Sequence, residues 1–226
     1  MGEMVSYPSN GGTSEGYLAL PEGNGPAVIV IQEWWGLVPH IKDLADRFAA
    51  EGFVALAPDL YHGVDTTEPD EAGKLMMGLA MDQAAKDISG AANYLAGRSE
   101  VTGKIGAVGF CMGGSLALWS ATLSDRIVAT VGFYPAVPWE RMSPQWANYA
   151  GKSAMIHCSE GDGTSAAPGI QQAKQAIEGA GGECILFDYP GTQHAFFNDE
   201  RADVHHADAS AGAWARTLEH FRTHLG

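Results

Sequence analysis

A cysteine that could act as a nucleophile lies in a turn directly after an apolar segment of strand length. Residues 109–113 read Gly-Phe-Cys-Met-Gly, and the pattern Gly-x-Cys-x-Gly is a nucleophile elbow with Cys111 at its centre. Its glycines let the backbone pass closely through a sharp turn that lifts the central side chain clear of the sheet. The following helix would point backbone N–H groups, first that of Met112, at an oxyanion formed beside the sulfur. The alternative is that Cys111 is a small buried hydrophobe.

Two later turns contain residues that could activate such a thiol. The turn at 158–162 contains Glu160 and Asp162, and the turn at 190–194 ends in His194. A thiol with an ordinary pKa of about 8.5 is mostly protonated at neutral pH, so an imidazole held in the right tautomer by a carboxylate would assist it. In folds with this elbow the acid precedes the histidine along the chain. We therefore expect His194 to be the base and Asp162 its partner, with Glu160 as the alternative acid.

Apolar runs of strand length alternate with segments of helical periodicity along the chain. The expected strands are residues 27–32, 53–57, 105–110, 127–133, 153–157 and 184–189. The expected helices are residues 39–51, 82–96, 115–123, 170–180 and 209–225. This alternation predicts an α/β fold with a mostly parallel central sheet and helices on both faces. Segment 62–78 is the least regular, and we expect it to be a short excursion over the end of the sheet.

Length and composition restrict the class of protein. The 226 residues, 46% of them hydrophobic, predict one domain spanning residues 1–226. A net charge of −14 argues against nucleic acid or an anionic membrane as a partner and favours a small molecule. Three cysteines and no signal-like segment predict a cytoplasmic protein, which we expect to be a monomer or a homodimer. His205 and His206 match no strong metal-ligand spacing, so no metal is expected.

Further motifs make the chain similar to the dienelactone hydrolase family. They are the elbow, Gln-Glu-Trp-Trp-Gly at 32–36, Pro-Asp-Leu-Tyr at 58–61 and Pro-Gly-Thr-Gln-His-Ala-Phe at 190–196. The resemblance spans nearly the whole chain and implies an α/β-hydrolase fold without a large lid domain, a thioester intermediate and no cofactor. It also implies that Glu33 hydrogen-bonds the resting thiol and disfavours the thiolate, and that the N–H of Trp34 is the second oxyanion donor.

One departure from the family concerns the substrate. Family members that act on dienelactone hold its carboxylate with arginines, one of them four residues after the catalytic histidine, where this chain has Asn198. Arg201 is nearby but out of register, and segment 62–78 contains Lys74 but no arginine. We therefore expect a small ester or lactone that is less anionic than dienelactone.

Aromatic residues near the motifs could form an apolar rim around such a substrate, with ordinary core packing as the alternative for each. They are Trp35, Tyr61, Phe110, Tyr134 and Phe196. The site would also suit activated phosphoesters, because an oxyanion hole recognises charge more than element. The competing hypothesis is a non-catalytic thiol protein, either a ligand carrier or a redox sensor, on the same scaffold.

Overall fold

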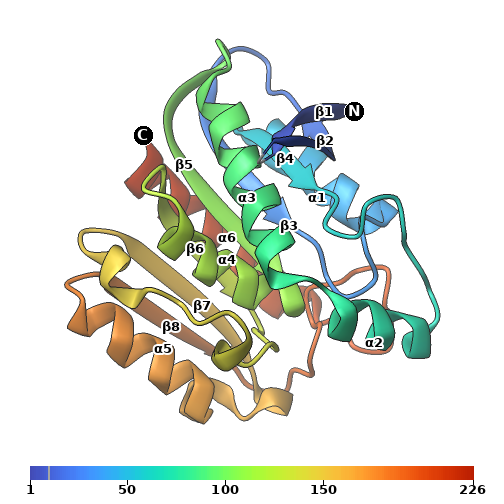
Figure 1. Cartoon of the computed structure of the whole chain (residues 1–226). Helices are drawn as coiled ribbons and strands as arrows, with labels where there is room; N and C mark the ends of the chain where they lie inside the picture. Colours follow the sequence, from blue (N-terminus) through green and yellow to red (C-terminus); the bar gives the residue numbers. More distant parts are fainter. Residues whose placement is uncertain (10) are drawn as a thin grey trace.

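The computed structural model describes residues 1–9 and 11–226, in which eight strands form one sheet (Figure 1). The strands are β1 (Glu3–Ser9), β2 (Gly12–Ala19), β3 (Gly25–Ile31), β4 (Val54–Pro58), β5 (Val101–Phe110), β6 (Ile127–Phe133), β7 (Ser153–Ser159) and β8 (Glu183–Tyr189). The helices are α1 (Pro39–Ala50), α2 (Pro69–Gly78), α3 (Met81–Ala96), α4 (Met112–Leu123), α5 (Pro168–Gly179) and α6 (Ala207–Leu225). Four short 3-10 turns are η1 (Trp139–Arg141), η2 (Trp146–Tyr149), η3 (Glu160–Asp162) and η4 (Thr164–Ala166).

The sheet is mostly parallel, as predicted. Its order is β1-β2-β4-β3-β5-β6-β7-β8, and the six strands from β4 to β8 in this order are parallel to one another. The carboxyl ends of these six strands therefore meet at one edge. Strand β5 lies between β3 and β6, and Gly109 is in register with Ile31 of β3 and Gly132 of β6. Ligand sites of open parallel sheets form at this edge, and β5 brings Cys111 to its middle.

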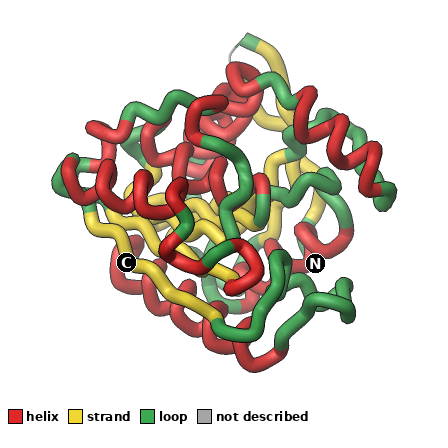
Figure 2. The backbone as a smooth tube through the Cα atoms, turned by 90° about the horizontal axis from the view of Figure 1, so that it is seen from below, coloured by secondary structure: helices red, strands yellow, loops and turns green. Residues whose placement is uncertain are grey.

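Helices cover both faces of the sheet, which confirms the predicted layers. Helices α1 and α6 lie on one face, where the rings of Phe48 and Trp214 are 4.6 Å apart, and α3 packs against α4 on the other. Figure 2 shows helices on either side of the strand layer. Helix α1 illustrates the cause: Ile41, Leu44 and Phe48 recur on one face and are fully buried.

Two parts of the fold differ from the sequence-based expectation. The antiparallel hairpin β1–β2 was not predicted, because β1 buries only Tyr7 and Ser9 and so lacks a clear apolar alternation. Segment 62–78 contains α2, which buries only Ala72 and therefore gave no helical apolar face to detect. Among the described residues, no helix is both long and apolar enough to cross a membrane.

Candidate active site

The turn that carries Cys111 has an unusual backbone conformation. Cys111 lies between β5 and α4 with φ 56° and ψ −117°, a region that residues with a side chain rarely adopt. Its N–H donates to the carbonyl of Phe133 at 3.1 Å, and its own carbonyl accepts from the N–H of Gly114 at 3.0 Å. Strain of this kind costs about 1–3 kcal/mol and persists only where the surroundings enforce it. The hydrogen bonds on both sides hold the sulfur-bearing residue in this position.

The glycines of the elbow are required by close backbone contacts. A Cβ atom on Gly113 would collide with the carbonyl oxygens of Ile31 and Gln32, and one on Gly109 would collide with Gly113 itself. Helix α4 can therefore begin directly above β3 and β5 only because these positions lack side chains. Sequence reasoning identified this elbow correctly as a strand, a sharp turn and a helix.

Asp162 and His194 meet at the same sheet edge from two different loops. His194 Nδ1 lies 2.8 Å from Asp162 Oδ2, although the residues are 32 positions apart in the chain. Ser159 Oγ donates to the same carboxylate oxygen at 2.5 Å. Burial by itself would raise the pKa of Asp162, but the hydrogen bonds from His194 and Ser159 outweigh it and lower that pKa. The carboxylate therefore stays charged beside the imidazole.

Glu160 is directed elsewhere. Its Oε2 accepts the N–H of Gly191 at 2.5 Å, and the two loops are further joined by the N–H of Gly161, which donates to the carbonyl of Thr192 at 2.9 Å. Of the two acids that the sequence offered, the structure brings Asp162 to His194 and uses Glu160 to connect the loops.

His194 lies between the carboxylate and the thiol. Burial would lower its pKa, but the hydrogen bond with Asp162 and the influence of the nearby Cys111 and Asp162 side chains raise that pKa to about 10. Tyr134 covers the imidazole, with ring centroids 4.9 Å apart, and its side chain is almost fully buried. An imidazole whose pKa is raised, held by a carboxylate and lying beside Cys111, is suited to accept a proton from a nucleophile. The arrangement can therefore support general acid–base chemistry at this sheet edge.

Glu33 has a different partner from the one that the resemblance implied. Its side chain is 2% exposed, and its Oε2 accepts a hydrogen bond from Asn198 Nδ2 at 2.9 Å. Burial raises the pKa of Glu33, while Asn198, His194 and Arg201 act in the opposite direction. The hydrogen bond that the structure gives this carboxylate is thus to Asn198 rather than to the thiol. Asn198, at 4% exposure, is a buried partner of Glu33 instead of an open substrate contact.

The two expected oxyanion donors lie just beyond the ends of the neighbouring strands β3 and β5. Met112 is the first residue of α4, so its N–H has no partner within the helix. Trp34 follows Glu33 beyond the end of β3, the strand beside β5, and its indole lies near Gly73 of α2. Both positions are consistent with donors at this sheet edge, and their joint role stays a prediction.

The residues of the expected aromatic rim differ in their burial, and their contact with substrate stays a prediction. Phe110 and Phe196 are fully buried: Phe110 stacks on Phe133 at 4.7 Å, and Phe196 packs on Tyr189 at 4.9 Å. Both belong to the core, because a side chain on β5 or behind the histidine turn points into the sheet layers. Tyr61 is nearly buried, and its hydroxyl donates to Met112 Sδ at 3.4 Å. Trp35 is half-buried and lines a cavity next to the site.

The cationic residues near the site are already engaged. Arg201 Nη2 lies 2.9 Å from Asp203 Oδ2, and Lys74 Nζ lies 2.6 Å from Glu71 Oε1. Arg141, which sequence reasoning did not single out, donates to the carbonyls of Met76 and Met77 at 3.2 Å and so holds the end of α2. No signal in the sequence indicated this contact, or those of Ser159 with Asp162 and Asn198 with Glu33. Among the described residues, no group of three or more His, Cys, Asp or Glu side chains is placed to hold a metal ion.

Comparison with known proteins gives consistent matches over the whole length. A family model described as "Dienelactone hydrolase family" matches residues 14–225. "Protein usf" of Aquifex pyrophilus is 36% identical over 233 residues, covering all of both chains. A "Putative carboxymethylenebutenolidase" of Aquifex aeolicus is 33% identical over 239 residues, again covering both chains completely.

Solved structures show the same overall arrangement. The crystal structure of a "Putative Dienelactone Hydrolase" from Klebsiella pneumoniae superposes with a TM-score of 0.84 at 26% identity, covering 98% of each chain. A dienelactone hydrolase-like promiscuous phosphotriesterase from metagenomic libraries superposes with a TM-score of 0.79 at 20% identity, covering 100% of this chain and 99% of the other. At 20% identity, the second likeness concerns the fold alone.

Proposed function

The chain belongs to the dienelactone hydrolase family and has an α/β-hydrolase fold without a large lid, and from this premise we propose that it cleaves small esters or lactones with Cys111, His194 and Asp162. The observation that carries the proposal is the position of His194, which contacts the Asp162 carboxylate at 2.8 Å and whose pKa is raised by both that carboxylate and Cys111. Membership of the family supports a hydrolase of the dienelactone hydrolase type. The triad, the thioester and the substrate class are our proposal.

Acylation begins when the thiol of Cys111 transfers its proton to His194. The sulfur of Cys111 attacks the ester carbonyl carbon, and the carbonyl electron pair moves onto oxygen to form a tetrahedral oxyanion. The N–H groups of Met112 and Trp34 stabilise this oxyanion, and one such donor is typically worth about 3 kcal/mol. The C–O bond of the ester then breaks, the imidazolium of His194 protonates the leaving alkoxide, and an acyl thioester remains on Cys111. In a lactone the alkoxide stays attached to the acyl group.

Deacylation reverses the same roles with water. Neutral His194 accepts a proton from water, whose oxygen attacks the thioester carbonyl within the same pair of N–H donors. The C–S bond breaks, the carboxylic acid leaves, and the proton on the imidazolium again faces the released thiolate. Asp162 keeps the ring oriented through Nδ1 during both steps, and Ser159 in turn fixes the carboxylate.

Glu33 takes part as a thiol-modulating group in this proposal. Its buried carboxylate lies beside the site, and the Asn198 amide gives it a partner in the resting enzyme. A carboxylate held by Asn198 is kept from competing with His194 for the thiol.

The charges around the site support a substrate less anionic than dienelactone. Arg201 and Lys74 are paired with Asp203 and Glu71, and both guanidinium nitrogens of Arg141 that face α2 are bonded to carbonyls. A free carboxylate on the substrate would therefore have to displace an existing partner. We expect higher kcat/KM for phenyl acetate than for a carboxylated analogue such as 4-acetoxybenzoate, and a strong preference for the carboxylated ester would contradict this substrate class.

Hydrolysis of p-nitrophenyl acetate by wild type and by Cys111→Ala tests the catalytic proposal. Turnover should fall at least about a thousandfold in the variant, since loss of the nucleophile leaves only binding and the oxyanion donors. The matched control is Cys184→Ala, because Cys184 is buried and its pKa is raised to about 12 by burial. Iodoacetamide should label Cys111 and abolish turnover. Labelling without any ester hydrolysis by the unlabelled protein would favour a non-catalytic thiol protein.

Slow hydrolysis of activated phosphotriesters is a second candidate activity. It is favoured by the likeness to a structure described as a promiscuous phosphotriesterase, and by the ability of an oxyanion hole to stabilise charge on a phosphoryl oxygen. Paraoxon turnover that disappears in Cys111→Ala would support it, and turnover unaffected by this substitution would contradict a shared site.

A further inference from the structure

Residues 64–78, which we call the strap, form a segment with little buried surface. The strap follows the turn after β4 and ends with α2. Only Ala72 of α2 is buried, while Met77 is 68% exposed, and Figure 1 shows α2 at the periphery of the molecule. A helix of ten residues is marginal by itself and depends on packing for its stability. The position of the strap therefore depends strongly on the few contacts that tie it to the rest of the chain.

The first end of the strap is tied to the chain after β3 through the backbone. The N–H of Thr66 donates to the carbonyl of Trp35 at 3.0 Å. Gly36, with φ 98°, lies so close to the strap that a Cβ atom there would be 2.7 Å from the carbonyl oxygen of Val64. This end can serve as a hinge, because its attachment does not depend on a side chain of the strap.

The other end of the strap is held by one side chain. Arg141 of η1 donates from Nη1 to the carbonyl of Met76 and from Nη2 to that of Met77, both at 3.2 Å. These carbonyls belong to the last turn of α2, where the helix dipole favours a cation and a charged donor makes a stronger hydrogen bond than a neutral one. Because η1 follows β6 and Trp35 follows β3, the strap is tied on both sides of β5, whose end carries Cys111.

The thiol lies in a site with a restricted entrance. Cys111 is only 8% exposed. Tyr61, three residues before the strap, donates to Met112 Sδ at 3.4 Å. Burial, and after it the charge of Cys111, raises the pKa of Tyr61, while the charge of Arg141 acts in the opposite direction. Tyr61 therefore lies within the influence of both the thiol and the side chain that holds the strap.

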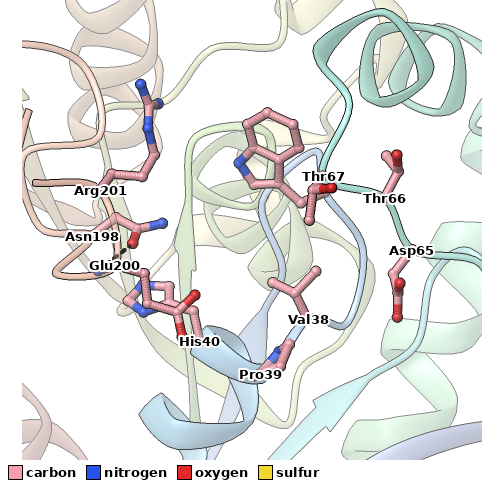
Figure 3. Close-up of a pocket in the computed structure, with 10 residues that line it drawn as sticks. Val38, Pro39, His40, Asp65, Thr66, Thr67, Asn198, Glu200 and Arg201 are labelled. Atoms are coloured by element: carbon pink, nitrogen blue, oxygen red, sulfur yellow. Dashed lines mark hydrogen bonds between the residues drawn. The ribbon is translucent and has the colours of Figure 1, made fainter. Parts of the chain in front are cut away.

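A cavity of about 460 Å³ opens beside the first part of the strap (Figure 3). Figure 3 shows residues 65–67 on one side of it and Asn198, Glu200 and Arg201 on the other. Its lining is mainly apolar and includes Trp35. Since one wall of the cavity belongs to the strap, a movement of the strap away from Asn198 would widen it. The widened cavity would give room to the apolar part of a larger ester.

We propose that the strap closes over the entrance to Cys111 and that Arg141 is its latch, a positioning residue that sets the size of ester that the site admits. With Arg141 bonded to Met76 and Met77, the closed strap admits small acyl groups. When these two hydrogen bonds break, α2 moves about its attachment at Thr66 and bulkier esters reach the sulfur. This inference rests on the proposed function and specifies how the size of the substrate is controlled.

Arg141→Met tests the latch, because methionine keeps an apolar stem and removes both donors. Hydrogen exchange of the amides of residues 69–78, followed by mass spectrometry, should become about three- to tenfold faster, the factor that corresponds to a lost hydrogen bond. The ratio of kcat/KM for p-nitrophenyl cyclohexanecarboxylate to that for p-nitrophenyl acetate should rise by a similar factor. The matched control is Arg126→Met, which should change neither quantity, since Arg126 is exposed and donates to Asn93 at 3.0 Å near the amino end of β6.

Gly73→Ala should have the opposite effect. A Cβ atom on Gly73 of α2 would lie 4.0 Å from Trp34 Cζ3, which is an ordinary contact distance. Because alanine also favours a helix over glycine, exchange of α2 should become about two- to fivefold slower and the ratio of bulky to small ester should fall. Gly179→Ala is the control, since the new Cβ at the end of α5 would meet no other segment within 4 Å. Changes of the same sign in Arg141→Met and Gly73→Ala would contradict the latch.

Labelling of the thiol separates this inference from the hydrolase proposal, because it needs no ester turnover. At Cys111, the rate constant for N-phenylmaleimide relative to that for the smaller iodoacetamide should rise about three- to tenfold in Arg141→Met and fall in Gly73→Ala. These changes in a protein that hydrolyses no ester would support the strap and overturn the hydrolase proposal. Ester hydrolysis through Cys111, with the same exchange, labelling ratio and size preference in wild type and both variants, would overturn the strap alone.

Discussion

Two histidines near the ends of neighbouring strands β7 and β8 have opposite properties. His194, after β8, contacts the Asp162 carboxylate, and Asp162 and the nearby Cys111 raise its pKa to about 10. His157, within β7, is fully buried between the hydroxyls of Thr217 and Tyr189 at 3.0 Å and 2.8 Å. Burial, with the charges of Arg216 and His220, lowers its pKa to about 3. Burial acts in the same direction on both rings, so the charged partners of His194 make the difference.

This comparison separates a structural histidine from a candidate catalytic one. A neutral imidazole between two hydroxyls joins β7 to β8 and α6, and it has no reason to gain or lose a proton at neutral pH. His194 lies one third exposed at the sheet edge, where its proton can move to substrate. The same residue type thus supports the core in one place and acid–base chemistry in the other because of its immediate partners.

The largest expected effect is on turnover when His194 is replaced. His194→Gln should lower kcat for p-nitrophenyl acetate about 10³- to 10⁴-fold or more, because thiol activation and protonation of the leaving group are both lost. His157→Gln, the matched variant, should leave kcat within a few fold while lowering the midpoint of urea unfolding. Equal losses of kcat in the two variants at matched folding would remove the distinction between the two histidines.

Replacing the carboxylate partner should have the next largest effect. Asp162→Asn should lower kcat roughly 10²- to 10³-fold, because the amide favours the wrong imidazole tautomer and no longer stabilises the imidazolium. Glu160→Gln provides the control, since Glu160 accepts a backbone N–H from Gly191 and does not contact the ring. If Glu160→Gln were the more damaging substitution, the assignment of the acid would be reversed.

The titration of the two imidazoles should differ in the same sense. Proton NMR should place the midpoint of His194 far above 6.5, near pH 10, and Asp162→Asn should lower it. His157 should stay neutral from pH 5 to 9, because its pKa is lowered to about 3. A His194 midpoint at or below 6.5 in wild type would contradict the raised pKa on which the proposed role of His194 as the base depends.

The smallest expected effect is on the free energy of unfolding, to which His194 and His157 should contribute with opposite dependence on pH. The raised pKa of His194 stabilises the fold fully below pH 6.5 and loses this contribution as pH rises through about 10; partial exposure keeps it small. The lowered pKa of His157 contributes stability above pH 6.5 that is lost as pH falls toward 3. Urea unfolding from pH 7 to 4 should therefore show a smaller loss in His157→Gln than in wild type. An unchanged acid dependence would exclude His157 as its source.

Local patterns in the sequence were sufficient for the sheet core and the elbow. Buried parallel strands such as β3 are continuous apolar runs, and the glycines around Cys111 mark a turn that admits no Cβ. Such patterns could not reveal α2, which buries one residue, or the edge hairpin of β1 and β2. Their stability depends on contacts with distant segments, such as those of Arg141 with α2.

The candidate site was predictable in its residue types but not in its contacts. The order of acid and histidine along the chain indicated the turns of Asp162 and His194 but left Glu160 as the alternative acid, and only coordinates show Glu160 bonded to Gly191. Asn198 and Glu33 are 165 positions apart, and no local pattern indicates that pair. In the sequence, His40 looks like an ordinary residue near a helix start, because only packing shows that both of its buried ring nitrogens lack a hydrogen-bond partner among the described residues.

The central claim is a covalent acyl group on the sulfur of Cys111. Mixing the protein with p-nitrophenyl acetate, quenching with acid within one turnover and mapping the peptides by mass spectrometry tests it directly. We expect one acetyl group on the peptide that contains Cys111, formed and lost at rates compatible with kcat. Continued turnover with no acetyl on this peptide, or with the acetyl on another residue, would contradict the account.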